Sequence, residues 1–139
     1  MELYKKVYEI CYECDSKDIA IEIVSSLSHE QELVQLLDEY NWGDSNEIPL
    51  AVINHPKCCL GIALKVYWMS GGDYYPNLEN GIQNEAPENV VFSLVKERIS
   101  SGYYKVAKVP FTESFNKVQL YKFKRLGLPE IFYTAFCAN

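Results

Sequence analysis

The stretch CCLGIALKVYWM at residues 58–69 is apolar around almost its whole circumference, and Lys65 is its one charged residue. A helix that is apolar on every side lies inside a protein and not on its surface. We therefore expect a buried central helix at 58–69. Gly61 costs a helix about 1 kcal/mol relative to alanine, so we expect another helix to approach closely there. Gly71 and Gly72 are expected to end this helix.

The segments on both sides of this stretch place apolar residues at helical spacing. Ser28 and Gln31 form the sequence pattern of a capping box before one of these helices. Pro49, Pro87 and Pro129 each stand where the first turn of a helix is expected. Helical periodicity is present in residues 2–14, 18–27, 30–40, 49–53, 88–99 and 129–136.

Two segments leave the secondary structure open. Residues 18–27 are dense in β-branched side chains and admit a strand as well as a helix. Residues 103–124 admit a short strand or hairpin, and Thr112 could instead cap a helix that starts at Glu113. Residues 73–86 read as a long loop. We predict one all-α, or nearly all-α, domain over 1–139, with six or seven helices around the central one.

The composition is that of a globular protein. The chain has 139 residues, 48% of them hydrophobic and 23% charged, which is typical of a single folded domain. It has no run of about 18 apolar residues that could span a membrane, and its first residues lack the layout of a signal peptide. An odd count of five cysteines is a poor disulfide framework. We therefore expect a cytoplasmic protein with reduced thiols and no membrane partner.

Charge is strongly segregated along the chain. Between Lys17 and Lys57 there are eight acidic residues and no basic one, whereas 96–125 holds eight basic residues and two acidic ones. The two segments could neutralise each other in the fold, or the acidic one could form a face for a basic partner. The net charge of -6 argues against a nucleic-acid partner, because binding phosphates requires positive charge.

Few residues have the chemistry of a catalytic or metal site. Cys11 and Cys14 stand three apart on an expected helix and could bind one metal ion together with His55 and Cys58; the alternative is that they are buried core cysteines. A Cys58 or Cys59 nucleophile with His55 as its base would need one shared solvated surface. We expect His55 to bond the backbone at a helix junction instead. We predict no catalytic residue, no cofactor and no enzymatic activity.

Aromatic residues near acidic ones mark a predicted binding patch. Side chains of this kind suit protein recognition. The alternative is that both tryptophans anchor the central helix. The predicted partner-binding residues are Asp38, Trp42, Asp44, Glu47, Trp68, Asp73 and Tyr74.

The sequence around the central helix resembles a known bacterial family. It reads YNW at 40–42, IP at 48–49, HP at 55–56, C at 58, LG at 60–61 and YW at 67–68, followed by ERI at 97–99 and GYY at 102–104. These motifs resemble the family called domain of unknown function 4274, over about 30–112. The resemblance implies a helical fold in a bacterial cytosol and supplies no catalytic residue. Cys59 stands where the family usually has aspartate, so the cap of the central helix must come from elsewhere.

The leading functional hypothesis is a non-catalytic protein-binding module. Small members of such families look like immunity proteins, so the expected partner is a basic toxin, for example a nuclease. One alternative is a small enzyme or metal-site protein that uses Cys11, Cys14, His55 and Cys58. Another is a structural subunit that forms a homo-oligomer.

Overall fold

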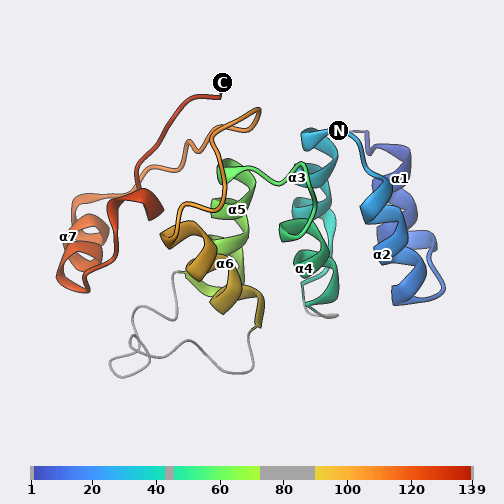
Figure 1. Ribbon diagram of the computed structural model, residues 1–139, viewed down its shortest axis with the longest axis horizontal. Helices are drawn as coiled ribbons and strands as arrows, with labels where there is room; N and C mark the ends of the chain where they lie inside the picture. Colours follow the sequence, from blue (N-terminus) through green and yellow to red (C-terminus); the bar gives the residue numbers. More distant parts are fainter. Residues whose placement is uncertain (1, 43–45, 73–89, 139) are drawn as a thin grey trace. The chain divides into compact units, whose positions relative to one another are not determined.

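The computed structural model describes residues 2–42, 46–72 and 90–138, and this part of the chain is helical, with no strand (Figure 1). The all-α prediction is confirmed. By contact the chain divides into two compact units, Met1–Cys58 and Cys59–Asn139. No helix in the described ranges is long and apolar enough to cross a membrane. The loop and helix start expected within 73–89, and the turn expected at 43–45, lie outside the described residues.

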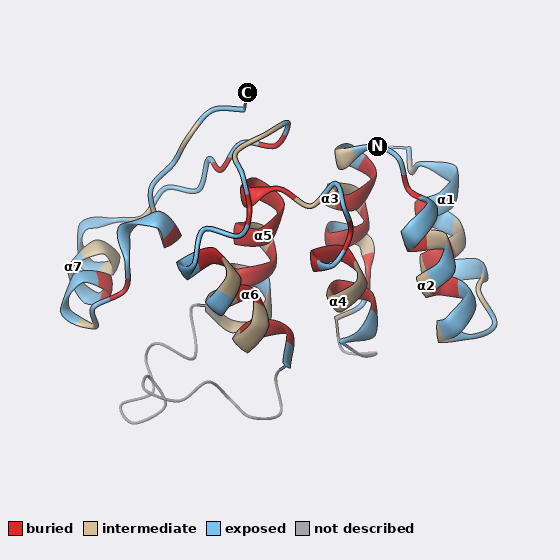
Figure 2. Ribbon diagram, viewed as in Figure 1, coloured by how far each residue is buried: buried red, intermediate tan, exposed pale blue. Residues whose placement is uncertain are grey.

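The first unit is built from short helices around an aliphatic core. They are α1 (Lys5–Tyr8), the π-helical turn η1 (Glu9–Glu13), α2 (Lys17–Ser26), α3 (Glu30–Glu39) and α4 (Glu47–Ile53). Helix α1 packs against α3, and α2 packs against η1 and α4; the buried parts of these helices are red in Figure 2. Each fully buried aliphatic side chain contributes roughly 1.5–3 kcal/mol. The most buried are Val7, Val24, Leu33, Leu36 and Val52.

Local capping explains the helix starts in this unit. Residues 17–26 are helical and not extended, since the Ser16 side chain accepts a hydrogen bond from the backbone N–H of Ile19 (3.3 Å). The predicted capping box of Ser28 and Gln31 is wrong: the capping box lies one residue later, at His29 and Glu32. Helix α3 starts after His29, and the Glu32 carboxylate accepts hydrogen bonds from the N–H groups of Ser28 and His29, both at 3.1 Å. A carboxylate satisfies these donors and also opposes the positive end of the helix dipole.

The second unit is built on the central helix. It contains α5 (Leu60–Tyr67), the π-helical turn η2 (Trp68–Gly72), α6 (Val90–Ser100), α7 (Lys117–Arg125) and the 3-10 turn η4 (Glu130–Phe132). Every residue of α5 except Lys65 is buried, and α5 packs against α6. Gly71, where the sequence predicts that the helix ends, has φ of 132° and leaves the helical conformation within η2.

A returning segment closes the N-terminus of α5. The Cys59 side chain makes no capping hydrogen bond; instead the N–H of Leu60 donates to the carbonyl oxygen of Lys105 (2.8 Å). The missing cap is thus supplied by backbone that lies 45 residues further along. Gly61 does allow a close approach, but the neighbour is the backbone of Val109 and not a helix: a Cβ at Gly61 would meet the Val109 carbonyl group.

The 103–124 region forms a helix and not a hairpin. Its first part is irregular, and Phe111 makes an isolated antiparallel bridge with Phe136. Thr112 caps no helix. Helix α7 begins after Asn116, whose side chain accepts from the N–H of Gln119 (2.8 Å), while the Gln119 side chain accepts from the N–H of Asn116 (2.9 Å). The short helix expected from Pro129 to Phe136 is only the 3-10 turn η4.

Candidate functional site

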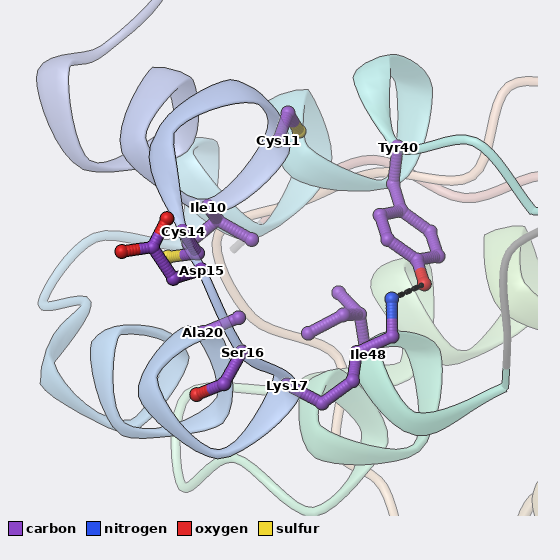
Figure 3. Close-up of a pocket in the computed structure, with 9 residues that line it drawn as sticks. All are labelled: Ile10, Cys11, Cys14, Asp15, Ser16, Lys17, Ala20, Tyr40 and Ile48. Atoms are coloured by element: carbon purple, nitrogen blue, oxygen red, sulfur yellow. Dashed lines mark hydrogen bonds between the residues drawn. The ribbon is translucent and has the colours of Figure 1, made fainter.

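The first unit contains a pocket of about 250 Å³ (Figure 3). It lies where η1, the turn before α2, the first turns of α2, the end of α3 and the start of α4 meet. Its wall is mixed, with aliphatic side chains beside a cation, a carboxylate and two thiols. The lining residues are Ile10, Cys11, Cys14, Asp15, Ser16, Lys17, Ala20, Tyr40 and Ile48.

Lys17 and Tyr40 form one wall of this pocket. The Lys17 ammonium group donates a hydrogen bond to the Tyr40 hydroxyl (3.2 Å), drawn as a dashed line in Figure 3. The same nitrogen lies 5.4 Å from the centre of the Tyr40 ring, within the range of a cation–π contact. Lys17 is the first residue of α2 and Tyr40 directly follows α3. The contact therefore joins the start of one helix to the end of another.

The two cysteine thiols lie at different places on the pocket rim (Figure 3). Burial raises the pKa of Cys11 from 9.0 to about 11, with further contributions from the charges of Glu39 and Cys14. Burial also raises the pKa of Cys14, and the neighbouring carboxylates of Glu9, Asp15 and Glu13 add to it. Both thiols are therefore protonated at neutral pH. The thiolate is the form that attacks an electrophile or binds a metal, so this environment disfavours both roles.

His55 bonds the backbone, as its sequence predicted. The N–H of Lys57 donates to Nδ1 (3.0 Å), so the ring proton is on Nε2, which lies 2.9 Å from the Leu27 carbonyl oxygen and donates to it. Both ring nitrogens are thereby engaged, and His55 is buried. It has no lone pair left for a metal or for base catalysis.

The structure does not gather the four metal-ligand candidates. In residues 2–42, 46–72 and 90–138, no three or more His, Cys, Asp or Glu side chains form a group that could hold a metal ion. Cys11, Cys14, His55 and Cys58 therefore do not form the tetrahedral set considered from the sequence. None of the five cysteines, all within the described ranges, forms a disulfide.

The predicted binding patch is distributed over both units. Asp38 and Glu47 are exposed on the first unit, and Trp42 is half-buried there and donates from its indole to the Leu37 carbonyl oxygen (3.0 Å). Asp44, Asp73 and Tyr74 lie outside the described residues. The binding role of these side chains stays a prediction.

Trp68 is an anchor of the second unit. Its indole N–H donates to the Phe132 carbonyl oxygen (2.9 Å). Its ring lies 5.0 Å from Phe115, 5.3 Å from Phe123 and 5.0 Å from Tyr67, measured between centroids. These contacts favour the structural interpretation of this tryptophan over a binding one.

Helix α1 and the turn η1 carry a surface that was not predicted from the sequence. Tyr8 and Tyr12 are 46% and 57% exposed, and their ring centroids are 5.2 Å apart. The Tyr12 hydroxyl donates to the carboxylate of Glu39. Glu13, the last residue of η1, and Asp15, which lies two residues beyond it, are both exposed. We call Tyr8, Tyr12, Glu13, Asp15 and Glu39 the acidic tyrosine surface. The signal was present in the sequence, since Tyr4, Tyr8 and Tyr12 recur every four residues.

Comparison with protein-family models gives a match. Residues 28–100 match the family model described as Domain of unknown function (DUF4274). The matched range runs from the start of α3 to the end of α6 and agrees with the resemblance noted around the central helix. No curated protein and no solved structure gives a significant match. Since the match covers more than half of the 139 residues, the chain belongs to the DUF4274 family.

Proposed function

We propose that this chain is a non-catalytic protein-binding module of the bacterial cytoplasm whose first unit binds a basic protein. In the manner of an immunity protein, it would neutralise a toxin such as a nuclease. Charge supports this proposal: Met1–Cys58 holds 12 acidic residues against 4 lysines. Such an excess attracts a cationic partner and accelerates its association.

The acidic tyrosine surface is the observation that carries the proposal. Two neighbouring, exposed tyrosine rings offer apolar area that costs little conformational entropy to order. Lysine and arginine side chains of a partner can lie over such rings while they pair with the carboxylates around them. Tyrosines are enriched among the residues that dominate binding energy. Tyr8 and Tyr12 lie against each other, Tyr12 contacts the Glu39 carboxylate, and the exposed carboxylates of Glu13 and Asp15 follow in the chain.

The environment of the cysteines and His55 favours binding over chemistry. Both pocket thiols have raised pKa values, and both nitrogens of His55 are engaged by backbone groups. A small enzyme that used these groups would need a thiolate or a ring nitrogen with a lone pair available. These observations support the binding proposal against its Cys/His alternative.

Affinity capture with matched variants tests the proposal. The immobilised chain is exposed to lysate of the source organism at low and at high salt. We expect one basic protein to be retained at low salt and released at high salt, because added salt screens charge pairs. The double variant Glu13→Lys/Asp15→Lys, which reverses two charges, should not retain this basic protein.

The control carries the same change of charge on the second unit. Glu97→Lys, Glu113→Lys alters two exposed carboxylates of that unit and should retain the partner as the wild type does. The reversal Asp38→Lys, Asp44→Lys, Glu47→Lys tests the patch predicted from the sequence. Loss of the partner in this triple variant alone would move the binding site away from the acidic tyrosine surface. Retention by every variant would overturn the proposal.

A further inference from the structure

Helix α7 presents a cationic face with an apolar centre. Val118 is 72% exposed and Tyr121 is 67% exposed, although both are large hydrophobic residues. Around them the helix carries four exposed cations and no acidic residue. Intervals of three and four residues place these side chains on one side of the helix. The cations are Lys117, Lys122, Lys124 and Arg125.

This face is displayed on a firmly built helix. A reciprocal capping box fixes the N-terminal end at Asn116. At the other end, Gly127 has φ of 76°, and the N–H groups of Gly127 and Leu128 donate to the carbonyl oxygens of Lys124 and Phe123; this is a Schellman motif. The helix backbone that carries the cationic face is thus ordered before any partner arrives, which lowers the entropic cost of binding.

The inner side of α7 is held by aromatic packing. The ring of Phe123 lies 5.3 Å from Trp68, 5.1 Å from Phe115 and 5.4 Å from Tyr133, measured between centroids. These contacts involve none of the exposed side chains of α7. Val118, Tyr121 and the four cations can therefore be changed without removing what anchors the helix.

The acidic tyrosine surface is the complement of this face. It too has exposed aromatic side chains, Tyr8 and Tyr12; the Glu39 carboxylate contacts Tyr12, and the exposed carboxylates of Glu13 and Asp15 follow in the chain. Interfaces commonly combine an apolar centre with charged residues of opposite sign at the rim. The two surfaces belong to different units of one chain, so each copy carries both halves of a contact.

We infer that the chain self-associates, with the cationic face of α7 in one copy docked on the acidic tyrosine surface of a second copy. A nine-residue helix is only about 14 Å long. The contact is smaller than a standard interface, so the association is weak, on the order of micromolar or weaker, and sensitive to salt. This inference uses the surface of the proposed partner site but does not require that the partner exists.

Sedimentation velocity of the purified chain over a range of concentrations tests the inference. We expect the average mass to rise with concentration at low salt, and the association constant to fall at least ~10-fold at about 0.5 M salt. The double variant Lys117→Glu/Lys124→Glu should remain monomeric. The double variant Glu13→Lys/Asp15→Lys should remain monomeric too. Tyr121→Ala, which keeps the charge, should weaken association as well.

Mixing the two reversed variants is the decisive step. In the mixture, the intact α7 of one variant meets the intact acidic tyrosine surface of the other, so a complex should form although neither variant associates alone. Lys105→Glu, Lys108→Glu, which alters exposed lysines outside α7, should associate as the wild type does. Circular dichroism confirms that each variant is folded.

A wild type that stays monomeric, an association that salt does not weaken, or a mixture that does not associate would overturn the inference. Failure of the self-association can be distinguished from failure of the proposed function. The α7 variant keeps the acidic tyrosine surface intact, so it should still retain a basic partner in the capture experiment.

Discussion

The Tyr12 hydroxyl donates a hydrogen bond to the Glu39 carboxylate and so joins η1 to the end of α3. This bond raises the pKa of Tyr12 above its ordinary value of 10.0, chiefly because only the protonated phenol can donate it. A raised pKa in the folded state contributes stability that is complete below pH 10 and lost as the pH rises above it. At neutral pH Tyr12 is therefore protonated and able to donate this bond.

Titration of tyrosinate absorbance tests this assignment. The difference between the wild type and Tyr12→Phe should be one tyrosine that ionises above pH 10. Replacing Glu39 by Gln removes the charged acceptor and should shift that ionisation downward. A difference curve centred at or below the ordinary value would show that the bond is absent in solution.

His55 should be important for the stability of the first unit. Replacing it by Ala leaves the Leu27 carbonyl oxygen and the Lys57 N–H without the partners they have now. Loss of partners for such groups costs about 1–3 kcal/mol in the free energy of unfolding. Lys57→Ala keeps the backbone donor and is the matched control, with an expected change within about 0.5 kcal/mol. Urea denaturation measures both, and equal stabilities would contradict this role.

Gly61→Ala should destabilise the second unit. Alanine normally favours a helix over glycine by about 1 kcal/mol, but here its methyl group would meet the backbone carbonyl of Val109. The 105–110 segment would have to move and would strain the Leu60–Lys105 hydrogen bond. We expect a net loss of about 1–3 kcal/mol on denaturation. An alanine variant as stable as the wild type would show that this segment does not close the helix end.

Cys11 should react slowly with alkylating reagents. Its pKa of about 11, against an ordinary 9.0, leaves ~100-fold less thiolate at pH 8 than an unshifted thiol has. We expect Cys11 to be alkylated about that much more slowly in the folded chain than in urea, with a rate that rises ~10-fold per pH unit up to pH 11. Peptide mass spectrometry measures it, with the exposed Cys137 as internal reference. Rapid labelling of folded Cys11 would revive the nucleophile hypothesis.

Local patterns predicted most of the fold. The buried α5 follows from the apolar run that contains it, and α7 was one of two readings that periodicity allowed. The capping side chain at Asn116 decided between them, and it acts within one helical turn. What could not be predicted is the pairing of Leu60 with Lys105, because such a contact depends on how distant segments pack.

The candidate site was predicted only in part. The backbone role of His55 was expected, since the residue precedes proline at the end of a helix. The engagement of both its nitrogens depends on Leu27, 28 residues away, which spacing does not indicate. Trp68 looked like a binding residue because aromatic side chains serve interfaces and cores equally well. Its contacts with Phe115 and Phe123 come from a segment for which the periodicity allows either a helix or a strand.

The most direct test of the central claim is the dissociation constant of the captured basic protein. It is measured for three forms of the chain: the wild type, the double variant Glu13→Lys/Asp15→Lys and the control double variant Glu97→Lys/Glu113→Lys. We predict equal affinity for wild type and control, and an affinity at least ~10-fold weaker for the reversed surface, with the difference shrinking at high salt. Equal affinity for all three would contradict the claim that the acidic first unit recognises the partner.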